Sequence, residues 1–82
     1  DNVPISIPRD GNIQHFTVDE LATFFRHLRI QENTVQKLKH KQLDGRRFGK
    51  LKDRTLEELG MKNPIIMYFR DRSSKDKTSF ML

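Results

Sequence analysis

Signals that begin and end helices stand close together along this chain, so no helix between them can run for more than a few turns. The segment from Thr17 to Glu20 has the form of a capping box, in which each of these two side chains bonds the backbone N–H of the other residue. Asp44-Gly45 marks a turn or a helix boundary. Gly60 fits a left-handed helix C-cap, and Asn63-Pro64 supplies an N-cap followed by proline at the first helical position. These signals predict several short helices.

Apolar residues at helical spacing indicate five helices. The first follows a hydrophobic staple between Phe16 and Leu21 and ends near Leu28 or Arg29. The second covers 32–40, the third 46–50, the fourth begins with Asp53 as its cap, and the fifth opens at Pro64. The residues expected in the core are Val18, Leu21, Ala22, Phe25, Leu28, Val35, Leu38, Leu43, Phe48, Leu51, Leu56, Leu59, Ile65, Ile66 and Phe69.

The two ends of the chain differ from this pattern. In 1–14 the apolar residues Val3, Ile5 and Ile7 alternate with others, which indicates an extended arm. Prolines at 4 and 8 disfavour a central strand, so we interpret 1–14 as a linker rather than a strand or a proline-rich ligand. Residues 73–82 are polar up to the last three and predict a disordered tail. The expected fold is an all-α, compact five-helix bundle over 15–72.

Composition narrows the class of protein. A chain of 82 residues allows one domain, and without cysteine it can form neither a disulfide nor a thiolate zinc site. No apolar run is long enough to span a bilayer and no signal-peptide pattern opens the chain, so we expect a cytoplasmic or nuclear location. The chain begins with Asp1 rather than Met, which suggests a piece of a larger protein.

Nothing in the sequence indicates catalysis. The three histidines, at 15, 27 and 40, show no metal-ligand spacing, and no oxyanion motif accompanies a nucleophile. The segment Gly45 to Gly49 is not a phosphate-binding loop. We therefore expect a protein that is not an enzyme, with no catalytic residue, cofactor or metal.

Positive charge is concentrated in the middle of the chain. The formal net charge is +5, and between Lys37 and Arg54 the only acids are Asp44 and Asp53. One interpretation is an ordinary solvated surface around a small core. The other is a positive field that speeds encounter with an anionic partner. The basic residues are Lys37, Lys39, His40, Lys41, Arg46, Arg47, Lys50, Lys52 and Arg54.

The order of these motifs resembles the sterile alpha motif (SAM) domain over residues 15–72. The resemblance rests on the segment from Phe16 to Leu21, on Leu43-Asp44-Gly45, on the spacing from Leu51 to Gly60, and on the apolar last helix. Three positions depart from the family pattern. Phe16 replaces a tryptophan, and Lys62-Asn63-Pro64 replaces a glycine and a basic residue. Gly49 replaces the second leucine of a pair, which predicts a missing or loosened contact.

The resemblance implies a protein–protein interaction module of a larger adaptor, scaffold or regulatory protein in signalling. SAM domains associate head to tail, with the middle surface of one domain against the start of the last helix of another, and identical domains can then form filaments. Both surfaces are basic here, so we expect weak or no self-association and an acidic protein partner, such as another SAM domain. The implied middle face comprises Arg46, Arg47, Lys50, Lys52, Asp53, Arg54 and Glu57, and the end face comprises Lys62, Asn63 and Arg70.

Other partners rank behind an acidic protein. Some SAM domains bind RNA hairpins, so nucleic acid is the second hypothesis, although no aromatic stripe alternates with the basic cluster. An acidic membrane surface ranks third. Tyr68 is interpreted as a packing residue, with phosphorylation as the alternative. The segment from Phe80 to Leu82 is similar to a PDZ-type ligand if Leu82 is a natural C-terminus.

Overall fold

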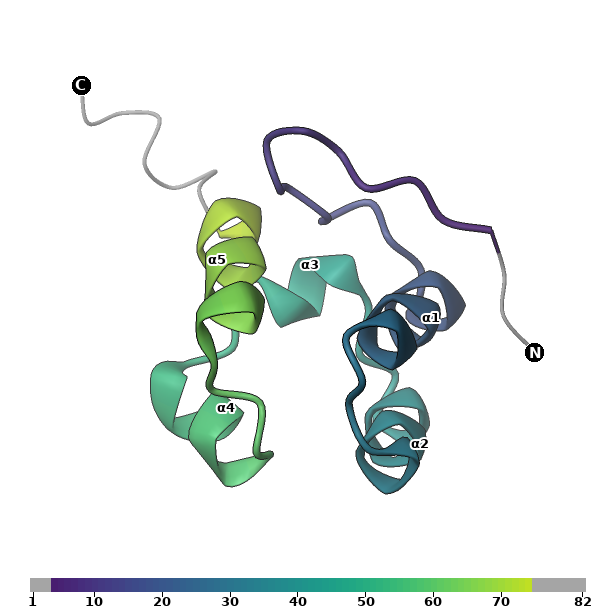
Figure 1. Ribbon diagram of the computed structural model, residues 1–82, viewed down its shortest axis with the longest axis vertical. Helices are drawn as coiled ribbons and strands as arrows, with labels where there is room; N and C mark the ends of the chain where they lie inside the picture. The colour runs from purple at the N-terminus through teal and green to yellow at the C-terminus, as the bar shows by residue number, and fades with distance from the viewer. Residues whose placement is uncertain (1–3, 75–82) are drawn as a thin grey trace.

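The computed structural model describes residues 4–74, and within that range it contains helices and no strand. The all-helical prediction is therefore confirmed. In Figure 1, α1 packs against α2 on one side of the molecule, α4 and α5 lie on the other side, and α3 lies between them. The helices are α1 (Val18–His27), α2 (Glu32–His40), α3 (Gly45–Phe48), α4 (Asp53–Glu58) and α5 (Pro64–Ser73).

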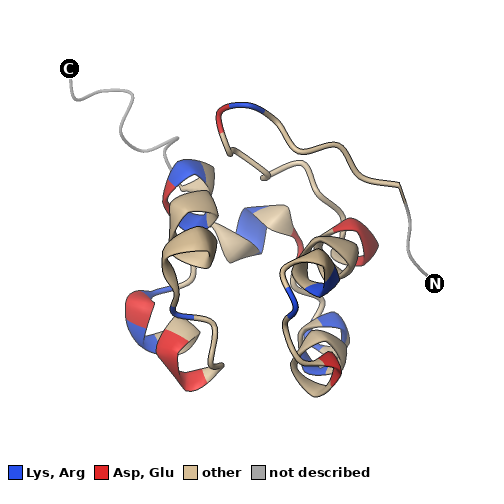
Figure 2. Cartoon of the chain, in the orientation of Figure 1, with Lys and Arg blue, Asp and Glu red and all other residues tan. Residues whose placement is uncertain are grey.

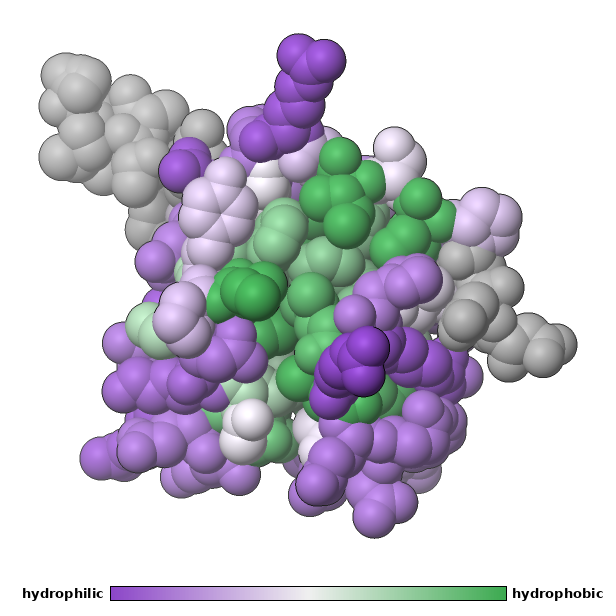
Figure 3. Space-filling model, in the orientation of Figure 1, coloured by the Kyte–Doolittle hydropathy of each residue, from purple (hydrophilic) through white to green (hydrophobic). Residues whose placement is uncertain are grey.

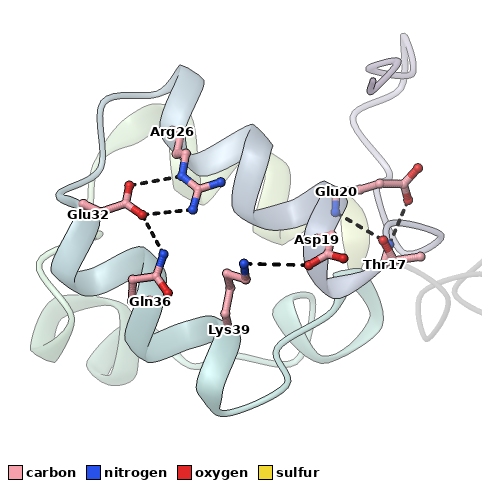
Figure 4. Close-up of polar contacts among 7 residues, drawn as sticks. All are labelled: Thr17, Asp19, Glu20, Arg26, Glu32, Gln36 and Lys39. Atoms are coloured by element: carbon pink, nitrogen blue, oxygen red, sulfur yellow. Dashed lines mark hydrogen bonds and ion pairs between the residues drawn. The ribbon is translucent and has the colours of Figure 1, made fainter. Parts of the chain in front are cut away.

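A capping box begins α1 as the sequence predicts, and an ion pair links α1 to α2. Thr17 Oγ1 accepts a hydrogen bond from the backbone N–H of Glu20 at 3.2 Å, and Glu20 Oε1 accepts one from the N–H of Thr17 at 2.9 Å (Figure 4). The guanidinium of Arg26 on α1 binds the carboxylate of Glu32 on α2 through its Nε and Nη2 atoms, at 3.1 and 2.9 Å. This pair fixes the turn between α1 and α2.

Two of the later caps also form as predicted, and one does not. Asn63 Oδ1 accepts from the N–H of Ile66 at 2.9 Å, and Gly60 has a left-handed φ of 72°. The prediction that Asp53 caps α4 is wrong. Lys52 is the residue before α4 and makes no side-chain cap bond, whereas Asp53 is the first helical residue and its carboxylate binds Arg70.

Aromatic rings connect the helices through the core. Phe24 on α1 contacts Phe16 at a centroid distance of 5.9 Å and Phe69 on α5 at 4.9 Å, both edge to face. Phe25 contacts Phe48 on α3 at 5.6 Å. These contacts join α1 to α3 and α5 with favourable geometry. The buried core comprises Ile13, Phe16, Leu21, Ala22, Phe24, Phe25, Val35, Leu38, Leu43, Phe48, Leu56, Met61 and Ile66.

The predicted core is mostly confirmed, with one clear error. Ile65 was expected to be buried, but it is 55% exposed, whereas its neighbour Ile66 is fully buried. The reason is helical phase, since Ile66, Phe69 and Ser73 occupy one side of α5 and Ile65 points away from it. Ile13 and Met61, which were not expected in the core, are both 0% exposed.

Glycines allow α3 to touch the backbone on both sides. A Cβ atom at Gly49 would lie 2.4 Å from the carbonyl oxygen of Ser73, and one at Gly45 would lie 1.9 Å from that of Ile13. No side chain fits at such distances. The prediction of a missing or loosened contact at Gly49 is therefore wrong, because the absent side chain lets α3 lie directly against the end of α5.

The boundaries of the folded part also differ from the expected ones. The segment before α1 belongs to it, because the N–H of Ile13 donates to the buried Ser73 Oγ at 3.0 Å. Helix α5 continues through Ser73, one residue past the expected end of the domain at 72. Helix α3 ends at Phe48 rather than at residue 50. Val3, most of the predicted tail and the segment from Phe80 to Leu82 lie outside the described residues.

Candidate functional site

The basic cluster of the sequence does not form one continuous face. Figure 2 shows Lys and Arg positions on α2, on α3 and on the connection between α3 and α4. Helix α2 and the α3–α4 connection lie on different sides of α3 (Figure 1). The cluster is therefore divided into a part on α2 and α3 and a part that follows α3.

In the part on α2 and α3, two cations already bind other groups of the chain. Lys39 Nζ lies 3.9 Å from Asp19 Oδ1 on α1 (Figure 4). Arg47 Nη1 donates to the carbonyl oxygen of Gln42 at 2.9 Å, which turns the side chain back over the α2–α3 turn. Lys37, Lys41 and Arg46 are exposed.

The second part borders a groove of about 370 Å³. Two lysines, Lys50 and Lys52, line it from the α3–α4 connection, and Arg70 lines it from α5. The remaining lining residues are Gly49, Leu51, Asp71 and Ser74. We call this feature the 49–74 groove. Three cations and one acid border it, and two of the cations, Lys50 and Lys52, have no acid partner among residues 4–74, so the groove favours anions.

Arg70 is the most constrained of these cations, with a side chain that is only 11% exposed. Its Nη2 donates to Asp53 Oδ1 at 2.5 Å, its Nη1 to the carbonyl oxygen of Leu51 at 2.7 Å, and its Nε to Asp71 Oδ1 at 2.9 Å. Burial lowers the pKa of Arg70, but the bonds to Asp53 and Asp71 outweigh it and the net shift is upward. The hydrogen bond from Arg70 lowers the pKa of Asp53.

The predicted end face is therefore not assembled as expected. Arg70 joins Asp53, a member of the predicted middle face, so these two residues hold α5 against α4. The side chain of Asn63 is occupied as the N-cap of α5. Lys62 remains exposed, and the exposed apolar residue near it is Ile65.

The predicted middle face carries charges of both signs, and its acids lie on α4. Helix α4 carries the acids Asp53, Glu57 and Glu58, which are all exposed, and Figure 2 shows this helix as the most acidic part of that side. Arg54 is the one cation within α4. Lys50 and Lys52 thus line the groove directly before an acidic helix.

One exposed apolar area was missed by the sequence interpretation. Figure 3 shows apolar atoms on the face that α5, α1 and the N-terminal segment present. Within residues 4–74, the large apolar residues with the greatest exposure are Ile7 at 49%, Ile65 at 55% and Tyr68 at 43%. The guanidinium carbon of Arg72 lies 4.5 Å from the centre of the Tyr68 ring. The three-residue spacing of Ile65 and Tyr68, out of phase with Ile66 and Phe69, could have indicated this area.

The described part of the chain contains no cluster of three or more His, Cys, Asp or Glu residues placed to hold a metal ion. No helix within residues 4–74 has the length and apolar character needed to cross a membrane. Comparisons with family models, with curated proteins and with solved structures found no match to this chain. The site must therefore be interpreted from its own geometry.

Proposed function

We propose that this chain is a SAM-type domain that binds an acidic surface of a partner protein, within a larger adaptor, scaffold or regulatory protein. Support for the SAM-type fold comes from the five-helix order and from the caps at Thr17, Asp44 and Gly60, which stand within the segments that carry the resemblance. The observation that carries the function is the 49–74 groove, where Lys50 and Lys52 are exposed and have no acid partner among the described residues.

The proposal accounts for the charge of the chain. Exposed cations without partners create a positive potential that attracts anionic molecules and increases the rate of encounter. The exposed cations Lys37, Lys41 and Arg46 contribute to this field from α2 and α3, and Lys50 and Lys52 from the groove. Lys62 adds positive charge near the start of α5, so two copies would repel each other if that end approached the groove.

The proposal is tested by comparing three anionic probes under the same conditions. Fluorescence anisotropy would measure the binding of a labelled oligo-aspartate peptide, a hairpin RNA and phosphatidylserine vesicles at low and physiological salt. We expect the peptide to bind, with an affinity that falls as salt increases. Tighter binding of the RNA would favour a nucleic-acid-binding SAM domain and would contradict the proposal, as would tighter binding of the vesicles.

Self-association is tested separately by sedimentation velocity over a range of protein concentrations. We expect a monomer at all concentrations, because the groove and the start of α5 are both positively charged. Filaments that dissolve with added salt would show that charge drives polymerisation and would contradict this part of the proposal.

A further inference from the structure

We infer that the 49–74 groove, rather than the basic surface of α2 and α3, is where the acidic partner binds, and that it takes carboxylate side chains from a short acidic protein segment. This inference rests on the proposed function and assigns it to one place in the fold. The groove lies between the α3–α4 connection and the C-terminal half of α5. Its volume of about 370 Å³ is in the range of binding pockets for small groups.

The groove presents cations of two different kinds. Lys50 and Lys52 are exposed and can turn toward a ligand, because a lysine ammonium group lies at the end of a flexible stem. Arg70 is fixed in place by Asp53, Asp71 and the carbonyl oxygen of Leu51. These bonds occupy three of its five N–H groups. Because Asp53 and Asp71 already balance the charge of Arg70, the free positive charge of the groove comes from Lys50 and Lys52. Two flexible ammonium groups close together in the chain suit two neighbouring carboxylates better than a single anion.

Gly49 contributes to the groove in a different way. Because it has no side chain, the backbone at the end of α3 lies against the carbonyl group of Ser73, and this contact fixes the distance between the two walls. The groove is therefore preformed, which lowers the entropy cost of binding.

The surroundings of the groove favour a short protein segment over a nucleic acid. The acids Asp53, Glu57 and Glu58 on α4 follow directly after Lys52 in the chain and would repel a continuous line of phosphates. Recognition of single-stranded RNA also uses aromatic rings for stacking. The exposed aromatic ring of α5, Tyr68, lies under Arg72 and does not line the groove.

Two double variants with equal changes of charge test the location. Lys50→Glu/Lys52→Glu reverses the groove lysines, and Lys37→Glu/Lys41→Glu reverses two exposed lysines on and after α2. Both change the net charge by the same amount, so they alter long-range attraction equally. Any difference between the two variants in affinity for the oligo-aspartate peptide then comes from direct contact between the peptide and the replaced lysines.

We expect the groove variant to weaken binding of the peptide at least about tenfold, and the α2 variant to weaken it about twofold. The conservative variant Lys50→Gln/Lys52→Gln should give a smaller loss in the same direction. Circular dichroism and amide spectra would show that each variant is folded. Peptide-induced shifts in the ¹H–¹⁵N spectrum of the wild-type chain should fall at Gly49–Lys52 and Arg70–Ser74.

The outcomes separate the two proposals. If the wild-type chain binds the peptide but the α2 variant loses as much affinity as the groove variant, or more, the groove assignment is overturned and the proposed function stands. Shifts confined to α2 and α3 would overturn the assignment in the same way. If the wild-type chain does not bind the peptide at all, both proposals are overturned.

Discussion

Arg70 near the end of α5 and Asp53 at the start of α4 form an ion pair, with 2.5 Å between the Nη2 and Oδ1 atoms. Residues 59–63 connect these two helices. Asp53 lies at the N-terminal end of α4 and Arg70 lies in the C-terminal half of α5. Arg70 also binds the carbonyl oxygen of Leu51 and the carboxylate of Asp71. One side chain therefore orders both the α3–α4 connection and the wall of the groove.

Replacement of Arg70 by Met should destabilise the fold. The variant keeps an unbranched apolar stem of similar shape but removes the hydrogen bonds to Asp53, Asp71 and Leu51. We expect the free energy of unfolding to fall by about 1–3 kcal/mol, as for other hydrogen bonds to charged groups. Urea titration followed by circular dichroism measures this change.

The control for Arg70→Met is Arg54→Met, because Arg54 is exposed and its side chain makes no ion pair or hydrogen bond within residues 4–74. Its effect should stay within about 0.5 kcal/mol. Equal losses of stability in the two variants would show that the Arg70 bonds add nothing beyond a surface charge.

The contacts of Arg70 show which features sequence can predict. The caps at Thr17, Gly60 and Asn63 depend on residues at most a few positions apart, so their patterns were sufficient to predict them. The Arg70–Asp53 pair spans 17 positions and depends on how α4 and α5 pack. The pair brings together one residue of each predicted face, and no local pattern in the sequence could have indicated this contact.

Dependence on helix packing also explains the other differences between the sequence predictions and the structure. Ile65 and Ile66 are equally apolar, and only the side on which α5 packs decides which of them is buried. The position of Gly49 against Ser73 spans 24 positions in the sequence, and a glycine gives no sign of what it touches. The lysines of the groove were predicted as candidate site residues. Their separation in space from the lysines of α2 could not be predicted, because it depends on how the helices are arranged (Figure 2).

Replacement of Gly49 by Ala should destabilise the fold, although alanine usually favours helical backbone over glycine. Gly49 has an ordinary helical φ of −64°, so propensity alone predicts a gain of up to about 1 kcal/mol. The added Cβ would lie 2.4 Å from the Ser73 carbonyl oxygen and would force α3 away from α5. We expect a net loss of about 1–3 kcal/mol in the free energy of unfolding.

Gly60→Asn is the matched control for Gly49→Ala. Nothing lies within 4 Å of a Cβ at Gly60, and asparagine tolerates its left-handed backbone better than other residues. This variant should lose less stability than Gly49→Ala. A Gly49→Ala variant as stable as the wild type would show that the two helices can separate freely.

The stability of the chain should depend on Glu32 at acidic pH. Hydrogen bonds from Arg26 and Gln36 lower the pKa of Glu32 from 4.5 to about 2 (Figure 4). A carboxylate with a lowered pKa in the folded state stabilises that state above its unfolded pKa, and the contribution is lost as the pH falls toward 2. In Glu32→Gln, this part of the pH dependence should be absent.

Thermal melting at a series of pH values measures the Glu32 effect. The wild-type chain should melt higher than Glu32→Gln above pH 5, and the two curves should converge as the pH approaches 2. The variant Glu57→Gln removes an exposed carboxylate that forms no ion pair within residues 4–74, and it should leave the wild-type profile unchanged. A constant difference between wild type and Glu32→Gln at every pH would contradict the prediction.

The segment before α1 should contribute to stability through Ile13. This residue is fully buried, so Ile13→Ala should lower the free energy of unfolding by about 2–5 kcal/mol. Ile7→Ala in the same segment removes a side chain that is 49% exposed and should cost about 0.5 kcal/mol or less. Chemical denaturation of both variants tests this. Similar small losses in both would indicate that the segment is a linker, as the sequence alone suggested.

Ser73 should matter more than its neighbour Ser74, although both are small polar residues at the end of α5. Ser73 Oγ accepts a hydrogen bond from the buried N–H of Ile13 at 3.0 Å, whereas Ser74 Oγ donates to the Asp71 carbonyl oxygen at the surface. Ser73→Ala leaves the Ile13 N–H without its partner, so we expect a loss of about 1–3 kcal/mol in the free energy of unfolding. Ser74→Ala should cost less than about 0.5 kcal/mol. Amide hydrogen exchange gives a second readout, because the Ile13 N–H should exchange much faster in Ser73→Ala and at the wild-type rate in Ser74→Ala. Unchanged protection of Ile13 in Ser73→Ala would show that another acceptor holds that N–H, and that the serine does not tie the N-terminal segment to α5.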